Sequence, residues 1–507
     1  MKFNLQLGKF RFGFGEQPQA VRSFGGASVI SRLNEDWLLP QTSADSELAP
    51  ALKNLRFRAR ELERTNEYVQ RYLDLIDNNV LGHCGVNLQM KITDPSGKMD
   101  VTANKIISDA WDKWKERKNC TPSGRQCWRE VEGMVLRRAA CDGGILIRLV
   151  KNWENEFKFA IQLIEIDQLD TDYSMRLQNG NEIRFGIEVD QWRRVVAYYI
   201  LKNHPGDYQA NARQRDRIPA NEILHVYLAT RPGQTVGHPW MASVMQALEH
   251  LGKYREAELV AARMEACKGY AIEQVTPDGW QGDTDANGSP SQEMSPGMAL
   301  NLAPGQKYVP IQPTHPNTAH GEFVKASLRG IAGGLSVNYN SLANDLESVN
   351  YSSMRAGKLE EVEEYKSIQS WLIESLHTPV FEAWLEMALI SGVIKSPNGT
   401  PLPVSKFEKF NSPCWKPRRW PWVDPLKDLQ ASVLAVEKGF KSRRSIIAEM
   451  GEDIEEVFQE QAEDNALAES LDLEFPTDVQ EKETPEMPET ETETTPAKLT
   501  LPQGVEE

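Results

Sequence analysis

The stretch that decides the fold is residues 323–355, FVKASLRGIAGGLSVNYNSLANDLESVNYSSMR. Apolar residues recur at helical spacing in its first part and predict a helix over residues 321–335. Two glycines then weaken the helix, and residues 336–350 are rich in Asn, Ser, Asp and Glu, which favours a polar loop. The helical period resumes at residue 352 and continues to residue 376. The pattern predicts two helices joined by a loop, which two ordinary core helices would also explain.

The segments before this stretch predict a long helix and then a large insertion. Residues 241–268 carry apolar side chains at helical spacing, whereas residues 269–320 are rich in Pro, Gly, Asn and Asp. A surface insertion would account for the composition of the second segment. It is nevertheless far longer than the roughly 2–8 residues that usually connect packed helices, and it is long for an idle loop in a compact protein.

The N-terminal half predicts an α+β fold. Residues 1–48 are polar and Gly-rich, which is typical of a partly flexible arm. Helical patterns follow over residues 49–80, 103–118 and 123–141, and short apolar runs between residues 145 and 228 are separated by turn signals. We therefore expect helices that lead into a mostly antiparallel sheet.

The negative charge is concentrated at the C-terminus. Residues 451–507 contain nineteen Asp or Glu and two Lys, a net charge of −17 within a total of −16, which leaves +1 for residues 1–450. Three short helices are predicted within residues 425–470, and the Pro-, Glu- and Thr-rich residues 471–507 are predicted to be disordered. A nearly neutral body argues against a broad basic face that grips nucleic acid.

No motif in the sequence points to catalysis, a metal or a cofactor. Phosphate-loop, dinucleotide-binding, nucleophile-elbow and zinc-protease patterns are lacking, and the six cysteines form no CxxC pair. His225 lies in an apolar run and is interpreted as a hydrogen-bonded core residue rather than a catalytic base. Asp167 and Asp170 could suggest a metal site, but they are interpreted as solvated strand or turn positions. The apolar runs are too short to span a membrane, and the N-terminus does not resemble a signal peptide, which suggests a cytoplasmic origin.

Residues 323–355 resemble the corresponding part of the phage lambda-like portal proteins, which form the ring through which a tailed phage packages and ejects its DNA. Val236, Ser336 and Asn338 depart from the pattern of that family. Six further blocks resemble it in the same order: residues 64–75 (RTNEYVQRYLDL), 162–169 (QLIEIDQL), 186–200 (GIEVDQWRRVVAYYI), 217–227 (RIPANEILHVY), 231–244 (RPGQTVGHPWMASV) and 424–466, which begins DPLKDLQASVLAVEKGF.

The resemblance implies a portal-type α+β subunit with long stem and wing helices, an antiparallel β-containing wing, a small clip and a helical crown. The implied parts are an N-terminal arm (1–48), the wing (49–238), a first stem helix (239–268), the clip (269–320), a second stem helix (321–335), a tunnel loop (336–350), the wing helix and crossing segment (351–424), the crown (425–470) and a disordered acidic tail (471–507).

The same resemblance implies a structural protein of the virion, assembled in the host cytoplasm, with no catalytic role, metal, cofactor or membrane. Twelve copies would form a ring at one capsid vertex. The implied partners are double-stranded DNA bound without sequence specificity, the terminase large subunit, head-completion and tail proteins, and the major capsid and scaffolding proteins. A minor capsid or adaptor protein without a channel, and a DNA-processing enzyme of mobile-element origin, are the alternatives.

The resemblance also assigns candidate site residues. Lys325 and Arg329 are possible basic residues of the channel lining, although a salt bridge within or between subunits would equally explain them. The tunnel loop is polar and acidic, so we expect it to guide DNA without gripping it. Its DNA-proximal residues would be Asn338, Tyr339, Asn340, Ser341, Asn344, Asp345, Glu347, Ser348 and Asn350.

Overall fold

The computed structural model describes residues 4–7, 10–13, 42–207, 214–266, 270–274, 306–310, 320–347, 351–420, 425–450 and 454–470. The chain divides into two compact units, Met1–Arg418 and Arg419–Glu507. Among the described residues, no helix is both long enough and apolar enough to cross a membrane.

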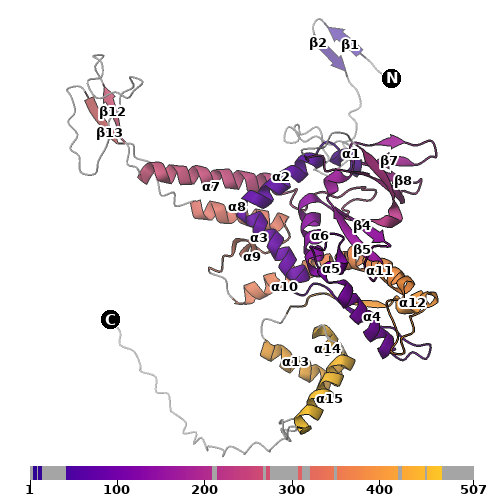
Figure 1. Cartoon of the computed structure of the whole chain (residues 1–507). Helices are drawn as coiled ribbons and strands as arrows, with labels where there is room; N and C mark the ends of the chain where they lie inside the picture. The colour runs from indigo at the N-terminus through magenta and orange to yellow at the C-terminus, as the bar shows by residue number, and fades with distance from the viewer. Residues whose placement is uncertain are drawn as a thin grey trace, which may run out of the picture. The chain divides into compact units, whose positions relative to one another are not determined.

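The first unit mixes helices with antiparallel sheets, as the sequence predicted (Figure 1). A five-stranded sheet has the order β10-β9-β8-β7-β6, and a three-stranded sheet has the order β11-β4-β5. The described strands of the first unit are β1 (Asn4–Leu7), β2 (Phe10–Gly13), β3 (Asn87–Met90), β4 (Ile145–Lys151), β5 (Phe159–Ile164), β6 (Met175–Arg176), β7 (Glu182–Arg184), β8 (Ile187–Val189), β9 (Val195–Leu201), β10 (Arg215–Pro219), β11 (Ile223–Val226), β12 (Tyr270–Gln274), β13 (Gln306–Pro310) and β14 (Pro413–Lys416).

The helices of the first unit hold most of its buried aromatic residues. Trp111 of α4 lies in the middle of a tryptophan cluster, 4.8 Å from Trp114, 5.6 Å from Trp128 and 5.0 Å from Trp384, measured between ring centroids. The helices of this unit are α1 (Ala44–Leu48), α2 (Leu52–Thr65), α3 (Glu67–Ile76), α4 (Val101–Trp114), α5 (Arg117–Cys120), α6 (Trp128–Asp142), α7 (Met245–Ala266), α8 (His320–Gly334), α9 (Tyr339–Ala343), α10 (Tyr351–Leu372), α11 (Thr378–Ser391) and α12 (Phe407–Phe410).

The helix predicted over residues 49–80 is interrupted. Asn66 adopts an extended backbone between α2 and α3, and its side chain accepts hydrogen bonds from the amides of Tyr68 and Val69. This is the geometry of an N-cap, so the asparagine ends one helix and begins the next. The exit from α3 is a π-helical turn, η2 (Asp77–Leu81).

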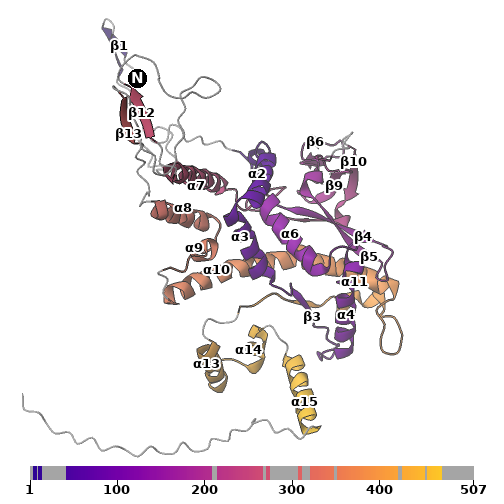
Figure 2. The same ribbon diagram turned by 60° about the vertical axis from the view of Figure 1, so that its left-hand side comes forward.

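Helices α7 and α8 form a hairpin, and they lie side by side in both views (Figures 1 and 2). The two helices approach closely at Gly334, where an added Cβ would lie 2.3 Å from Cγ1 of Val244. The start of α7 and the end of α8 are buried, but Leu259, Val260 and Phe323 are exposed. Only one end of the hairpin is therefore covered by the described part of this chain.

The long helix predicted from residue 352 is present as α10. It continues into α11 through a π-helical turn, η5 (Ile373–His377), in which Leu376 and His377 are fully buried. Gln369 ties this helix to the rest of the unit, because its amide donates hydrogen bonds to the carbonyls of Val80 and Arg418.

The second unit contains the three helices predicted within residues 425–470: α13 (Pro425–Glu437), α14 (Arg443–Met450) and α15 (Ile454–Ser470). Among its side chains of described burial, only Ala468 is buried. Several large apolar side chains are instead exposed: Leu429, Val433, Leu434, Phe440, Phe458 and Leu467. These helices lack a core of their own within the described residues.

Candidate functional site

The predicted loop between α8 and α10 contains a short helix. The prediction of a loop throughout residues 336–350 is wrong for α9, Tyr339–Ala343. The side chain of Asn338 caps this helix by accepting the amide hydrogen of Asn340 at 3.1 Å, and Leu342 anchors it by being buried. Asn344 ends the helix with a positive φ of 53°. Ser348 and Asn350 lie outside the described residues.

Helix α9 is hydrogen-bonded to the neighbouring helices. The buried carboxylate of Glu361 on α10 accepts the backbone N–H of Asn338 at 3.3 Å and the hydroxyl of Ser341 at 3.0 Å. On the opposite side, the guanidinium of Arg71 on α3 donates to the carbonyl of Ser341 at 3.1 Å. These contacts hold residues 338–341 against the rest of the unit.

The residues after α9 form an acidic turn. Asp345 accepts the Tyr339 hydroxyl at 2.7 Å and the Glu347 amide at 3.0 Å. The hydrogen bond from Tyr339 is the main reason that the pKa of Asp345 lies below its usual value. The pKa of Tyr339 is raised to about 12, first by partial desolvation and then by this carboxylate. Asp345 therefore stays ionised at neutral pH.

Both predicted channel-lining cations have partners within the same chain, Lys325 in this turn and Arg329 in α9. Lys325 Nζ lies 3.2 Å from Glu347 Oε2 and 4.0 Å from Asp345 Oδ2, and the pKa of Lys325 is raised chiefly by Glu347. The guanidinium of Arg329 lies 5.4 Å from the centroid of the Tyr339 ring, which is a cation–π distance. For Lys325, the structure contains the salt bridge within the subunit that the sequence analysis gave as the alternative to DNA contact. That either residue lines a channel stays a prediction.

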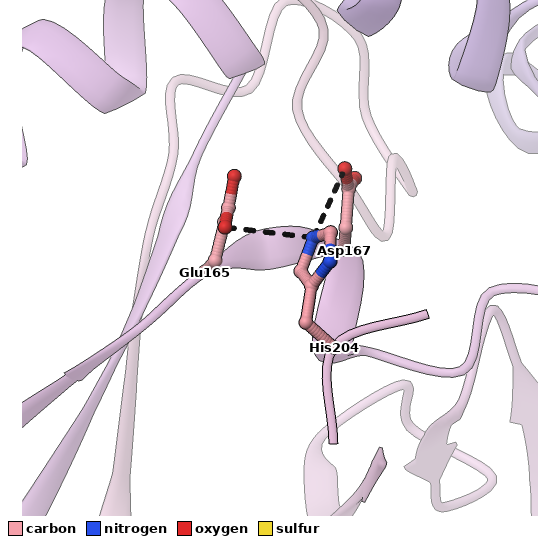
Figure 3. A group of neighbouring side chains, drawn as sticks. All are labelled: Glu165, Asp167 and His204. Carbon is pink, nitrogen blue, oxygen red and sulfur yellow. Dashed lines mark ion pairs between the residues drawn. The ribbon is translucent and has the colours of Figure 1, made fainter. Parts of the chain in front are cut away.

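A second polar cluster, of Glu165, Asp167 and His204, was not singled out from the sequence (Figure 3). His204 Nε2 lies 3.5 Å from Glu165 and 3.9 Å from Asp167. Carboxylate and imidazole are metal-ligand types, but Arg60 already pairs with the same two carboxylates: it donates a hydrogen bond to Asp167 at 2.5 Å, and its Nη2 lies 3.0 Å from Oε1 of Glu165. The guanidinium already supplies the positive charge that a metal ion would bring.

Two further interpretations from the sequence need correction. Asp167 and Asp170 are not solvated: Asp167 pairs with Arg60, and the buried Asp170 pairs with Arg215 at 3.0 Å. His225 contacts the rings of Tyr198 and Tyr227, but among the described residues its Nε2 has no hydrogen-bond partner. Burial lowers its pKa to about 3, so the imidazole is neutral.

Comparison with known proteins identifies the family. The model of the phage portal proteins of the lambda family matches residues 31–369. The probable portal protein of Halomonas phage phiHAP-1 is 34% identical over 458 residues, which cover 89% of this chain and 87% of that protein. Portal protein B of Escherichia phage lambda is 22% identical over 482 residues, or 86% of this chain and 88% of that protein. The chain belongs to the lambda family of phage portal proteins.

Solved structures of phage-like particles are also similar. A chain from the neck of the native gene transfer agent particle is 12% identical, with a TM-score of 0.40 over 78% of this chain and 93% of that chain. A chain from the virion of the native gene transfer agent particle is 11% identical, with a TM-score of 0.41 over 83% and 98%. The family membership itself rests on the sequence matches.

Proposed function

We propose that this chain is the repeating subunit of a portal ring, a dodecamer at one capsid vertex, and that DNA enters and leaves the head through its channel. The match to the portal family over residues 31–369 is the observation that carries the proposal. The head-to-tail contacts of identical subunits generate a closed ring when the rotation between neighbours closes. Every side chain that faces the axis is then repeated in each subunit.

The exposed apolar residues support assembly into such a ring. Leu259 and Val260 on α7 and Phe323 on α8 lie on a hairpin whose far end is not covered within the described chain. The helices of the second unit expose a larger set, as described above. Large exposed apolar side chains on an otherwise polar surface are typical of protein–protein contacts, and neighbouring subunits would cover them.

We further propose that the site around α9 is the part of the subunit nearest to DNA. It holds two cations, Lys325 and Arg329, and two carboxylates, Asp345 and Glu347, so the charges of these four residues balance. A balanced lining avoids deep binding minima, and DNA can then move in either direction. The terminase, head-completion, tail, capsid and scaffolding proteins are the proposed protein partners. The proposed role is structural, without catalysis, in the virion after assembly in the host cytoplasm.

Microscopy of the purified protein tests the ring. Negative-stain images should show rings with a central hole. Compact monomers at concentrations up to those found during assembly would instead favour the alternative of a minor capsid or adaptor protein without a channel.

Charge reversal tests the DNA-proximal site. Replacing both Asp345 and Glu347 with lysine should slow DNA packaging and make it more sensitive to salt, because each subunit would then add two cations that bind phosphates. The rate of DNA packaging into proheads that carry the variant, measured over a range of salt concentrations, tests this prediction. The matched control reverses Asp112 and Glu116, two exposed carboxylates that also pair with lysines. Equal packaging by both variants would contradict a DNA-proximal position for residues 345–347.

A further inference from the structure

We propose that Asp345 and Glu347 form an acidic latch that holds residues 344–347 against α8 through Lys325, and that phosphate groups of duplex DNA open the latch by displacing these carboxylates. The inference rests on the proposed function, because it describes how the same site responds to DNA. It makes Lys325 the residue that positions the end of the segment.

The contacts divide the segment into a held part and a releasable part. Residues 338–341 are held by Glu361 and Arg71, and Leu342 is buried beneath them. Beyond Asn344, the described contacts to α8 are those that Lys325 makes with the two carboxylates. Asn344, with its left-handed backbone, marks the boundary between the two parts. Loss of the lysine contacts would free Glu347 from α8 and leave Asp345 held only by the Tyr339 hydroxyl of α9, with α9 itself in place.

The exposure of the ion pair makes the latch easy to open. The side chain of Glu347 is 78% exposed and that of Lys325 is 34% exposed. Pairs of this kind contribute little net stability, since water solvates both charges well and salt screens their attraction. A phosphate that approaches α8 therefore competes with Glu347 on nearly equal terms.

The basic face beneath the latch suits a phosphate backbone. Arg329 follows Lys325 by four residues, so both cations lie on one side of α8, about 6 Å apart along its axis. Lys and Arg side chains are the usual ligands of DNA phosphates, and such contacts carry no sequence information. Opening exchanges one anion for another at Lys325, and the released carboxylates repel the duplex. Each subunit would therefore hold DNA weakly, as a channel for two-way movement requires.

Hydrogen exchange of the purified full-length protein tests whether the latch exists. Lys325→Met should raise the exchange rate of the backbone amides of residues 344–347 by about two- to fivefold, because Glu347 loses its partner on α8. Exchange of residues 339–343 should not change. The matched control is Lys366→Met, which removes another lysine that pairs with a glutamate of the same chain, Glu363 on α10. Unchanged exchange in the Lys325→Met variant would overturn the proposal.

A second hydrogen-exchange experiment adds a short DNA duplex of mixed sequence to the protein at low salt. In the wild-type protein the duplex should accelerate exchange of residues 344–347, and high salt should abolish this effect. In Lys325→Met the segment is already released, so the duplex should add nothing. A duplex without effect on the wild-type protein would overturn opening by phosphate. Failure of the portal function would appear separately, as absent rings or as heads that do not package DNA.

Discussion

Replacement of Asp142 with alanine is expected to lower the free energy of unfolding by about 3–5 kcal/mol, because it removes the buried carboxylate that Arg60 and Arg138 share. Asp142 ends α6, and its side chain is 1% exposed. Its two carboxylate oxygens accept from Arg60 at 2.7 Å and from Arg138 at 3.2 Å. The neighbouring Arg56 donates to the Asp142 carbonyl at 3.1 Å, and burial lowers the pKa of Arg56. Chemical denaturation followed by fluorescence measures the change.

The same charge network supplies the control. Asp74→Ala removes a carboxylate that pairs with Arg137 at 3.2 Å but is 57% exposed, and it should cost less than about 1 kcal/mol. The two variants lose the same chemical group and differ in burial. Similar effects for Asp142→Ala and Asp74→Ala would show that burial of the network is unimportant for stability.

The second large effect concerns a buried acid and base inside the first unit. Glu132 of α6 and His377 of η5 are both fully buried, with Glu132 Oε1 3.5 Å from His377 Nε2. Burial raises the pKa of Glu132 to about 8, although the Val86 amide, Arg129 and Lys115 act against this shift. Burial lowers the pKa of His377 to about 3. Both groups are therefore neutral in the folded protein at neutral pH.

The pH dependence follows from the protons bound in each state, taking unfolded pKa values of 4.5 and 6.5. Between pH 4.5 and 6.5 the pair binds one proton in the folded state and one in the unfolded state, so it does not make the free energy of unfolding depend on pH. From pH 6.5 to 8 only the folded state keeps a proton, and stability falls by about 1.4 kcal/mol per pH unit, or about 2 kcal/mol in all. Below pH 4.5 the unfolded state binds the extra proton, and stability falls toward pH 3.

Glu132→Gln separates this pair from the other titrating groups. The amide oxygen can still accept the Val86 N–H. Because glutamine carries no titrating proton, unfolding of the variant above pH 6.5 releases no proton from this position. Thermal unfolding measured from pH 5 to pH 9 should therefore show a smaller loss of stability on the alkaline side for the variant than for the wild-type protein. Parallel curves would mean that Glu132 does not hold its proton in the folded state.

Local patterns predicted most elements because their signals lie within a few residues. The period of apolar residues predicted α8 and α10, and short apolar runs between turn signals predicted antiparallel strands. Helix α9 was missed because its five residues are too short to show a period. The one local signal that could have revealed it is Asn338, an N-cap residue four positions before the buried Leu342.

Charge pairing was the least predictable property. Asp167 follows a strand and reads as a surface residue, yet it meets Arg60 from a helix 107 positions earlier. Glu132 and His377 are likewise brought together from α6 and η5. Nothing in the spacing of these residues signals the contact, since only chain folding determines which helix packs on which strand.

The sequence alone determined the family, the order of helices and strands, and the polar, acidic character of residues 336–350. Each of these properties depends on the local sequence pattern and on composition. The tertiary structure decided which charges are neutralised. It placed Lys325 against the acidic turn and Arg329 against α9, so both candidate DNA contacts also have a partner within the chain, Glu347 and Tyr339. The physical reason is that an ion pair depends on distance in space, which the spacing along the chain does not encode.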